Sequence, residues 1–443
     1  MSLMNSISMK LAPTHLALAA AVALAPACAT SPQAAPPTTS ASKSANETAA
    51  ASAASTTATM LADAARLLKE GKPTDAKAKY QAVLKREPQS LDAQVGMAAA
   101  QIRLGEYDDA RAGLAALQKQ KPESREVIIL LGILHKEKGD YDSGISLYEK
   151  EIEKQKQKGE KLDADMLNNL VVLYRLSKKY DVAEKTCTTL LSRDPNNVDA
   201  LKNLSLLYYD QGKYALAETI AVNSLKLNDR DAALYNNRGM IRVKRGRYPE
   251  AMSFFYKAAE IDPTNTSAHL NIGSISLRYR DYQTAAKHFA EAIRLEPRHP
   301  AANLGLGLAM AGVSGGLPPD QQQKKGPEAI SQLQKALEID ANAVEALGEI
   351  AMVQKLQLNQ VGDAKATCDK YKDARGGKLD DKDPMKGECQ NIDNDIKAQE
   401  AAKRAMEQMK EQEEADKAKA PPEKAVEKPV EGQKPAEGAP PAK

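Results

Sequence analysis

The stretch Gly212-Lys-Tyr214-Ala-Leu-Ala217 returns 34 residues later as Gly246-Arg-Tyr248-Pro-Glu-Ala251. The same frame, a tyrosine followed three positions later by a small residue, occurs six times. Its tyrosines are Tyr107, Tyr141, Tyr180, Tyr214, Tyr248 and Tyr282. Four of the five steps between them are 34 residues, and the step from Tyr141 to Tyr180 is 39. A fixed period of this length is typical of repeat proteins, in which each unit packs on its neighbours.

Each residue type in the frame has a physical task. Glycine stands two residues before four of the six tyrosines, where a turn between helices often needs a left-handed backbone. Lys178 and Arg280 replace it in the other two units. The alanine lets two helices approach closely. Prolines in the same register end the units, because proline cannot continue a helix; they are Pro88, Pro122, Pro195, Pro263 and Pro297.

This period and these residue types resemble the tetratricopeptide-repeat (TPR) family, whose unit is two antiparallel helices. The resemblance implies an all-α fold, a right-handed TPR superhelix (α-solenoid) of about eight to nine helix-turn-helix repeats. We expect TPR repeats over residues 58–341 and a degraded repeat with a C-terminal cap over 342–396. In the eighth repeat a loop beginning at Gly312 is expected to separate the two helices, between Met310 and Pro327.

Composition agrees with a solenoid and excludes some partners. Aromatic residues make up only 4% of the 443 residues and there is no Trp, so a thick central core is not expected. The 62 basic and 59 acidic residues leave a net charge of +3, too small to indicate nucleic acid or an anionic membrane surface as the main partner. No apolar run approaches the roughly 20 residues of a membrane-spanning helix.

The N-terminus has the pattern of an export signal. Lys10 precedes an apolar stretch from Leu16 to Ala25, which ends in the small residues before Cys28. A basic start, a short apolar segment and a small-residue exit are typical of a secretory signal peptide, predicted here over residues 1–27. Residues 28–57 are mostly Ala, Ser, Thr and Pro, which predicts a disordered linker.

Two cleavage sites are possible. Ala25-Pro26-Ala27 fits an ordinary signal peptidase and gives a soluble periplasmic protein. The same segment resembles a bacterial lipobox, which ends in a cysteine that receives lipid, here Cys28. The lipobox interpretation places the protein on the periplasmic face of the outer membrane, because Ala29 replaces the Asp that would retain it in the inner membrane.

Asparagines form another series in the same register. Asn169, Asn203, Asn237 and Asn271 are each 34 residues apart, and Asn168, Lys202 and Asn236 stand beside them. In the TPR frame they lie on first helices, which line the concave groove. Because an amide carries donors and an acceptor, such a row can bind the backbone of an extended peptide. The alternative is a structural row that hydrogen-bonds between neighbouring repeats.

The sequence gives no sign of catalytic, cofactor or metal chemistry. The five histidines form no pair at metal-ligand spacing, and phosphate-binding and nucleophile motifs are missing. We therefore predict that the protein is not an enzyme. Cys368 and Cys389 flank a Gly- and Asp-rich stretch, and an exported protein can keep a disulfide. A Cys368–Cys389 bond is predicted, with two free thiols as the alternative.

The C-terminal residues 397–443 are predicted to begin as a charged helix and to continue as a Pro-rich disordered tail. The layout of the whole chain resembles bacterial outer-membrane TPR lipoproteins, including pilotin-like proteins of type IV pilus secretins. The linker and tail also resemble TPR lipoproteins of myxobacterial adventurous gliding motility. The resemblance implies a protein–protein interaction scaffold that assembles or anchors an envelope-spanning machine. It would bind other envelope proteins through the concave groove and the outer membrane through the lipid. The alternative is a soluble periplasmic chaperone that binds extended peptides.

Overall fold

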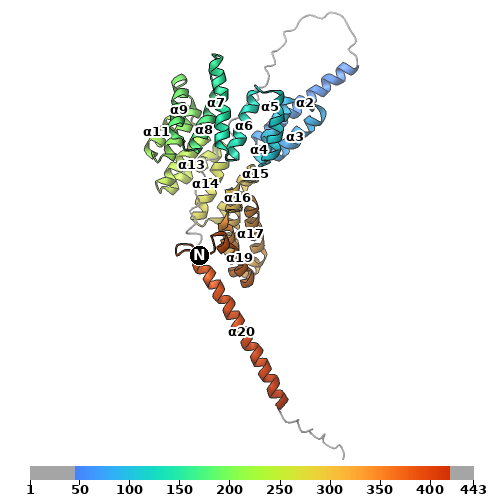
Figure 1. The fold of residues 1–443 in the computed structure, drawn as a ribbon, viewed down its shortest axis with the longest axis vertical. Helices are drawn as coiled ribbons and strands as arrows, with labels where there is room; N and C mark the ends of the chain where they lie inside the picture. The colour runs from blue at the N-terminus through green and yellow to red at the C-terminus, as the bar shows by residue number, and fades with distance from the viewer. Residues whose placement is uncertain (1–44, 420–443) are drawn as a thin grey trace, which may run out of the picture. The chain divides into compact units, whose positions relative to one another are not determined.

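The structure, a computed structural model, describes residues 45–419, and all regular secondary structure in this range is helical (Figure 1). Eighteen of the helices pair into nine consecutive hairpins, which we number as repeats 1 to 9. The pairs are α2 (Ala45–Lys69) with α3 (Pro73–Arg86), α4 (Leu91–Leu104) with α5 (Tyr107–Gln120), α6 (Arg125–Glu137) with α7 (Tyr141–Gln157), α8 (Ala164–Leu176) with α9 (Tyr180–Arg193), α10 (Val198–Asp210) with α11 (Tyr214–Leu227), α12 (Ala232–Lys244) with α13 (Tyr248–Ile261), α14 (Thr266–Arg278) with α15 (Tyr282–Leu295), α16 (Pro300–Gly315) with α17 (Pro319–Ile339), and α18 (Val344–Leu356) with α19 (Val361–Ala374). The predicted α-solenoid is confirmed.

The turn between the two helices of a repeat has the predicted geometry. Each tyrosine of the frame is the first residue of a second helix. The glycine before it is left-handed, with φ of 74° at Gly105, 73° at Gly139 and 74° at Gly212. Lys178 and Arg280 adopt the same region, with φ of 60° and 61°. A side chain in this region costs roughly 1–2 kcal/mol, so packing of the two helices imposes the turn even where glycine is absent.

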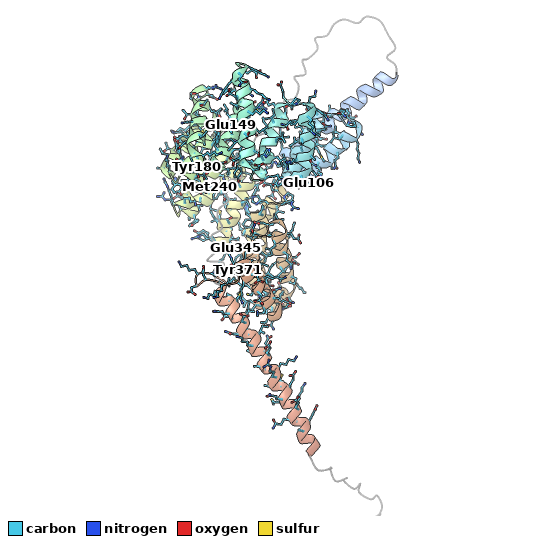
Figure 2. All side chains as sticks on the ribbon, in the orientation of Figure 1. Glu106, Glu149, Tyr180, Met240, Glu345 and Tyr371 are labelled. Atoms are coloured by element: carbon cyan, nitrogen blue, oxygen red, sulfur yellow. The ribbon has the colours of Figure 1, made fainter. Side chains whose placement is uncertain are left out.

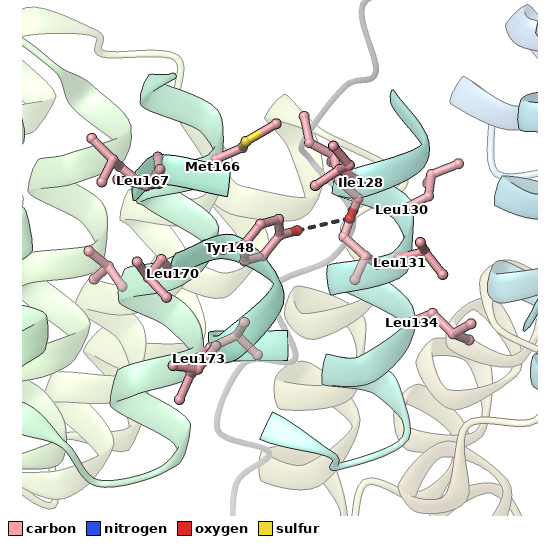
Figure 3. Packing of buried hydrophobic residues seen from close by; sticks show 14 of the residues in the cluster. Ile128, Leu130, Leu131, Leu134, Tyr148, Met166, Leu167, Leu170 and Leu173 are labelled. Atoms are coloured by element: carbon pink, nitrogen blue, oxygen red, sulfur yellow. Dashed lines mark hydrogen bonds between the residues drawn. The ribbon is translucent and has the colours of Figure 1, made fainter. Parts of the chain in front are cut away.

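Close helix packing explains the small residues. The frame alanines Ala110, Ala183, Ala217, Ala251 and Ala285 are fully buried. In repeat 3 a Cβ on Gly132 would lie 2.1 Å from the Tyr148 ring, so glycine makes room for the ring of the second helix. Tyr148 donates its hydroxyl hydrogen to Ile129 O at 2.9 Å, amid leucines of neighbouring helices (Figure 3). Large and small residues therefore interlock between the two helices of a repeat. Side chains surround all the hairpins (Figure 2).

Two helical boundaries differ from the predictions. α2 begins at Ala45, inside the segment predicted as a disordered linker, since its alanine-rich sequence has high helix propensity. In repeat 8 the predicted long loop is wrong: α16 continues to Gly315 and α17 begins at Pro319, with Pro327 inside the helix. Proline suits the first helical position, and Gln322 Nε2 donates to Leu317 O at 2.8 Å next to this start.

The repeats form one compact unit that ends at Lys386, and α20 (Lys386–Lys419) continues into a second unit. α20 contains the predicted charged helix and carries a 4.0 Å ion pair between Arg404 and Glu400. None of the helices in residues 45–419 is long and apolar enough to cross a membrane. The predicted signal peptide, Cys28 and the Pro-rich segment 420–443 lie outside the described residues.

Candidate peptide-binding site

A polar cavity of about 490 Å³ lies along the first helices of repeats 4 to 7 and the loops before them. Asparagine is its most frequent lining residue, and we call it the asparagine pocket. The lining includes Asn168, Asn169, Lys202, Asn203, Arg230, Asp231, Asn236 and Asn237. The 34-residue period brings these side chains together, because each repeat presents the same helix position to the same face.

Six of the seven residues predicted to bind peptide line this pocket. The seventh, Asn271, is fully buried and is not part of the lining. Its Nδ2 donates to Asn236 Oδ1 at 2.9 Å, across the boundary between repeats 6 and 7. The four asparagines are therefore not equivalent, since Asn271 supports the pocket wall through Asn236 instead of facing the pocket.

Hydrogen bonds between repeats use part of the asparagine series. Asn203 Nδ2 donates to Asn168 Oδ1 at 3.2 Å, in the same relation as Asn271 to Asn236. This bonding is what the structural alternative predicts. Other amide atoms take no part in this bonding. Asn203 Oδ1 and Asn237 Nδ2 are buried and have no hydrogen-bond partner within residues 45–419. Such atoms are costly unless water or a ligand satisfies them.

Charged residues at the pocket are mostly paired. Lys202 Nζ lies 2.6 Å from Asp199 and 3.0 Å from Asp231. Burial acts to lower the pKa of Lys202, but the two carboxylates outweigh it and the pKa is raised. Asp165 pairs with Arg125. Arg230 is exposed and has no ion-pair partner in the described part of the chain, so its charge is available to a ligand.

Asp231 and Arg230 were not among the residues predicted from the sequence, although a signal for Asp231 exists. Asp231 accepts a hydrogen bond from Leu234 N at 3.1 Å and so caps α12. Capping residues recur every 34 positions at the starts of first helices. They are Asp163, Asn197, Asp231, Asn265 and His299. Two members of this second polar series, Asp231 and Asn265, place a carboxylate and an amide in the lining of the pocket.

The other candidate residues lie apart from the pocket. Cys368 in α19 and Cys389 in α20 are both buried and each is disulfide-bonded; their pairing with each other stays a prediction. Cys187 is a buried free thiol, and burial raises its pKa to about 12. Within residues 45–419 no group of three or more His, Cys, Asp or Glu side chains is placed to hold a metal ion.

Comparison with solved structures finds helical repeat proteins at low identity. A chain of the APC/C Cut9–Hcn1 hetero-tetramer gives a TM-score of 0.43 at 17% identity, over 66% of this chain and about half (55%) of that one. A tetratricopeptide repeat protein from Parabacteroides merdae gives 0.42 at 18%, over 57% and 98%. PilF of Pseudomonas aeruginosa gives 0.42 at 18%, over 52% and 96%. No curated protein matches the chain.

Two family models match, and both describe the tetratricopeptide repeat. One matches residues 67–134, and the other matches residues 129–198, 202–266 and 270–311. Together they cover more than half of the chain, and they overlap every helix that lines the asparagine pocket. The protein therefore belongs to the tetratricopeptide-repeat family.

Proposed function

We propose that this protein–protein interaction scaffold binds an extended segment of its partner in the asparagine pocket. The observation that supports this proposal most directly is that two buried amide atoms, Asn203 Oδ1 and Asn237 Nδ2, have no hydrogen-bond partner among the described residues. One is an acceptor and the other a donor, as in a peptide backbone, so an extended chain toward which these two pocket-lining side chains turn can satisfy both. The exposed Arg230 adds a preference for a segment that carries an acidic residue. The proposal assigns the chain no catalysis.

The proposed location is the periplasmic face of the outer membrane, where the scaffold assembles or anchors an envelope-spanning machine of the gliding-motility or type IV pilus kind. The export signal and the lipobox-like segment ending at Cys28 support this location. Metabolic labelling with palmitate tests it. The parent should incorporate label and the Cys28→Ala variant should not; an unlabelled parent would leave the alternative of a soluble periplasmic chaperone.

Substitution of Asn237 tests the pocket. Because its Nδ2 donates no hydrogen bond in the free protein, Asn237→Ala should keep the free energy of unfolding close to that of the parent. Binding of a permanently unfolded, acidic polypeptide (reduced and carboxymethylated lactalbumin) should weaken several-fold, since one buried hydrogen bond contributes about 1 kcal/mol. Unchanged affinity would refute binding at this position.

Photo-crosslinking identifies the partner. A photoreactive residue at Arg230 lines the pocket and removes no ion pair, whereas the exposed Lys185 on α9 lies outside the pocket lining and serves as the control. In the source bacterium, crosslinks to envelope proteins are expected from position 230 and not from position 185. Equal crosslinking from both positions would contradict a partner held in the pocket.

A further inference from the structure

The solenoid contacts itself between its first repeats and repeat 7. Arg294 Nη1, at the end of α15, donates to Gly71 O at 3.1 Å, across 223 positions of sequence. Gly71 lies in the turn between α2 and α3. Figure 1 shows α15 next to the N-terminal repeats. Neighbouring repeats also pack on one another along the chain, so this contact closes repeats 1 to 7 into a ring.

The glycines of the turns show how close this contact is. A Cβ on Gly71 would lie 2.2 Å from Leu295 Cδ2, and a Cβ on Gly105 would lie 3.2 Å from Arg298 Cδ. Gly139 has nearly the same φ as these two, yet a Cβ there would meet nothing within 4 Å. The turns of repeats 1 and 2 are thus covered by the end of repeat 7, while the equivalent turn of repeat 3 is open.

Charged groups from both segments meet beside this contact. Burial lowers the pKa of Arg103 at the end of α4, and Glu296, Glu137 and Asp262 oppose that change. Burial also raises the pKa of Tyr107, the first residue of α5, to about 12, with Glu137 and Glu296 adding to the effect. Glu106, between Gly105 and Tyr107, is labelled in Figure 2 and pairs with Lys77 of repeat 1 at 2.5 Å. Repeats 1 and 2 are therefore tied to each other and jointly face repeat 7.

We propose that this contact is a clasp, formed by Gly71, Gly105, Arg294, Leu295 and Arg298, which controls sideways entry of a partner into the asparagine pocket. The inference rests on the proposed function, since it concerns access to the same site. The pocket lies in repeats 4 to 7, within the ring that the clasp closes. A long polypeptide can enter a closed ring only by an end, whereas an open solenoid accepts it from the side.

The clasp joins turns and helix ends and includes no helix core, so it can open while the repeats stay folded. The hydrogen bond, the packing of two turns and the neighbouring charged groups together are small beside the buried core of each repeat. The protein then exists as a mixture of molecules with a closed and an open clasp. The apparent affinity for the partner and its association rate rise with the fraction of open molecules. Binding of a partner from the side selects the open state.

A matched pair of glycine substitutions tests the clasp. Gly71→Asn and Gly139→Asn place the same residue at nearly the same φ, and asparagine tolerates the left-handed region. Only the first puts a Cβ against Leu295. Spin labels at the exposed positions 75 in α3 and 287 in α15 report the distance across the clasp, in full-length protein carrying Cys28→Ala. Cys187 is buried and stays unlabelled.

The distance should lengthen in Gly71→Asn and stay at the parent value in Gly139→Asn. Association of carboxymethylated lactalbumin should be roughly tenfold faster in Gly71→Asn, in proportion to the open fraction. Equal distances in the two variants would overturn the clasp, and a longer distance with an unchanged rate or no binding would overturn its control of access. If Gly71→Asn speeds association while Asn237→Ala changes no affinity, the clasp stands and the pocket assignment fails.

Discussion

The first helices of repeats 3 and 6 occupy equivalent places and bury opposite kinds of side chain. Leu130 in α6 and Asn237 in α12 both stand eleven residues before the tyrosine of their repeat, and both are buried. Around Leu130 a single apolar cluster runs from Val95 to Leu207, through repeats 2 to 5. Beyond it the apolar core divides into smaller clusters, and the same repeats bury polar residues such as Asn236, His269 and Asn303.

The difference assigns separate tasks to the apolar and the polar part of the core, which overlap in repeats 4 and 5. Apolar burial stabilises by about 25 cal/mol per Å², whereas a buried hydrogen bond contributes only about 1 kcal/mol net. The apolar part therefore holds the shape, and the polar part accepts a less stable core in return for groups that can recognise a peptide. Each of the following predictions tests this division.

The largest effect is expected at Leu130. Leu130→Ala leaves a cavity in the continuous cluster and should lower the free energy of unfolding by about 3 kcal/mol. Denaturant unfolding measures the loss, and hydrogen exchange should show α6 and α8 opening first in the variant. Val182→Ala is the control, because Val182 is 44% exposed. If both variants lost the same free energy of unfolding, the prediction that the apolar cluster stabilises the fold would be wrong.

The polar part should lose stability in acid. Burial lowers the pKa of His299 to about 4, while Glu137 opposes the shift, and its neutral Nδ1 accepts from Ala302 N at 3.3 Å. The folded pKa lies below the unfolded value of 6.5, so the stabilisation is present above pH 6.5 and is lost as pH falls toward 4. One such group contributes a slope of at most about 1.4 kcal/mol per pH unit.

His299→Asn separates this titration from helix capping, because asparagine is also a good N-cap. Between pH 7 and pH 5 the variant should lose less stability than the parent in urea unfolding. A remaining slope is expected from His288, whose pKa is also lowered to about 4, first by burial and then by His269. Identical slopes for parent and variant would exclude His299 as a contributor.

A smaller loss is expected from the hydrogen bonds between repeats. Asn271→Ala leaves Asn236 Oδ1 without its donor and should cost about 1–2 kcal/mol. The double variant with Asn236→Ala should lose less than the sum of the two single losses, as measured by a double-mutant cycle. Asn237→Ala, which breaks no such bond, is the control. Additive losses would show that the 2.9 Å bond stabilises nothing.

The smallest expected effect is a gain in stability, and it should be equal in repeats 4 and 7. Lys178→Gly in repeat 4 and Arg280→Gly in repeat 7 each remove a side chain from a left-handed turn, so each should raise stability by about 1 kcal/mol. Thermal unfolding measures both. A gain in one repeat only would mean that the strain depends on the surrounding core and not on the turn alone.

Periodic features were predictable from the sequence, and contacts that break the period were not. The tyrosine frame predicted the turn and the second helix of six repeats, because the turn residue, tyrosine and alanine act locally, and the structure begins each of these helices at the tyrosine. The asparagine series predicted six pocket residues, since equal spacing means equal placement. The same reasoning treated Asn271 as equivalent, although its repeat pairs it with Asn236 and buries it.

The features that were missed depend on distant or competing interactions. Gly71 meets Leu295 through the curvature of the whole ring, and no spacing in the sequence indicates this contact. α17 begins at Pro319 and continues through Pro327, where the predicted loop ends, because the Pro318-Pro319 pair already supplies a helix start. The Ala-rich composition predicts disorder at the start of α2, whereas alanine also has the highest helix propensity and the structure is helical from Ala45.

The bond between Arg294 and Gly71 also has a mechanical consequence. A solenoid whose repeats touch only their neighbours stretches like a spring from the first increment of force. Because the end of repeat 7 is bonded to repeat 1, a force that pulls these repeats apart acts first on this contact. We expect the protein to resist stretching until this contact breaks, so tension would permit the sideways entry that the proposed clasp controls.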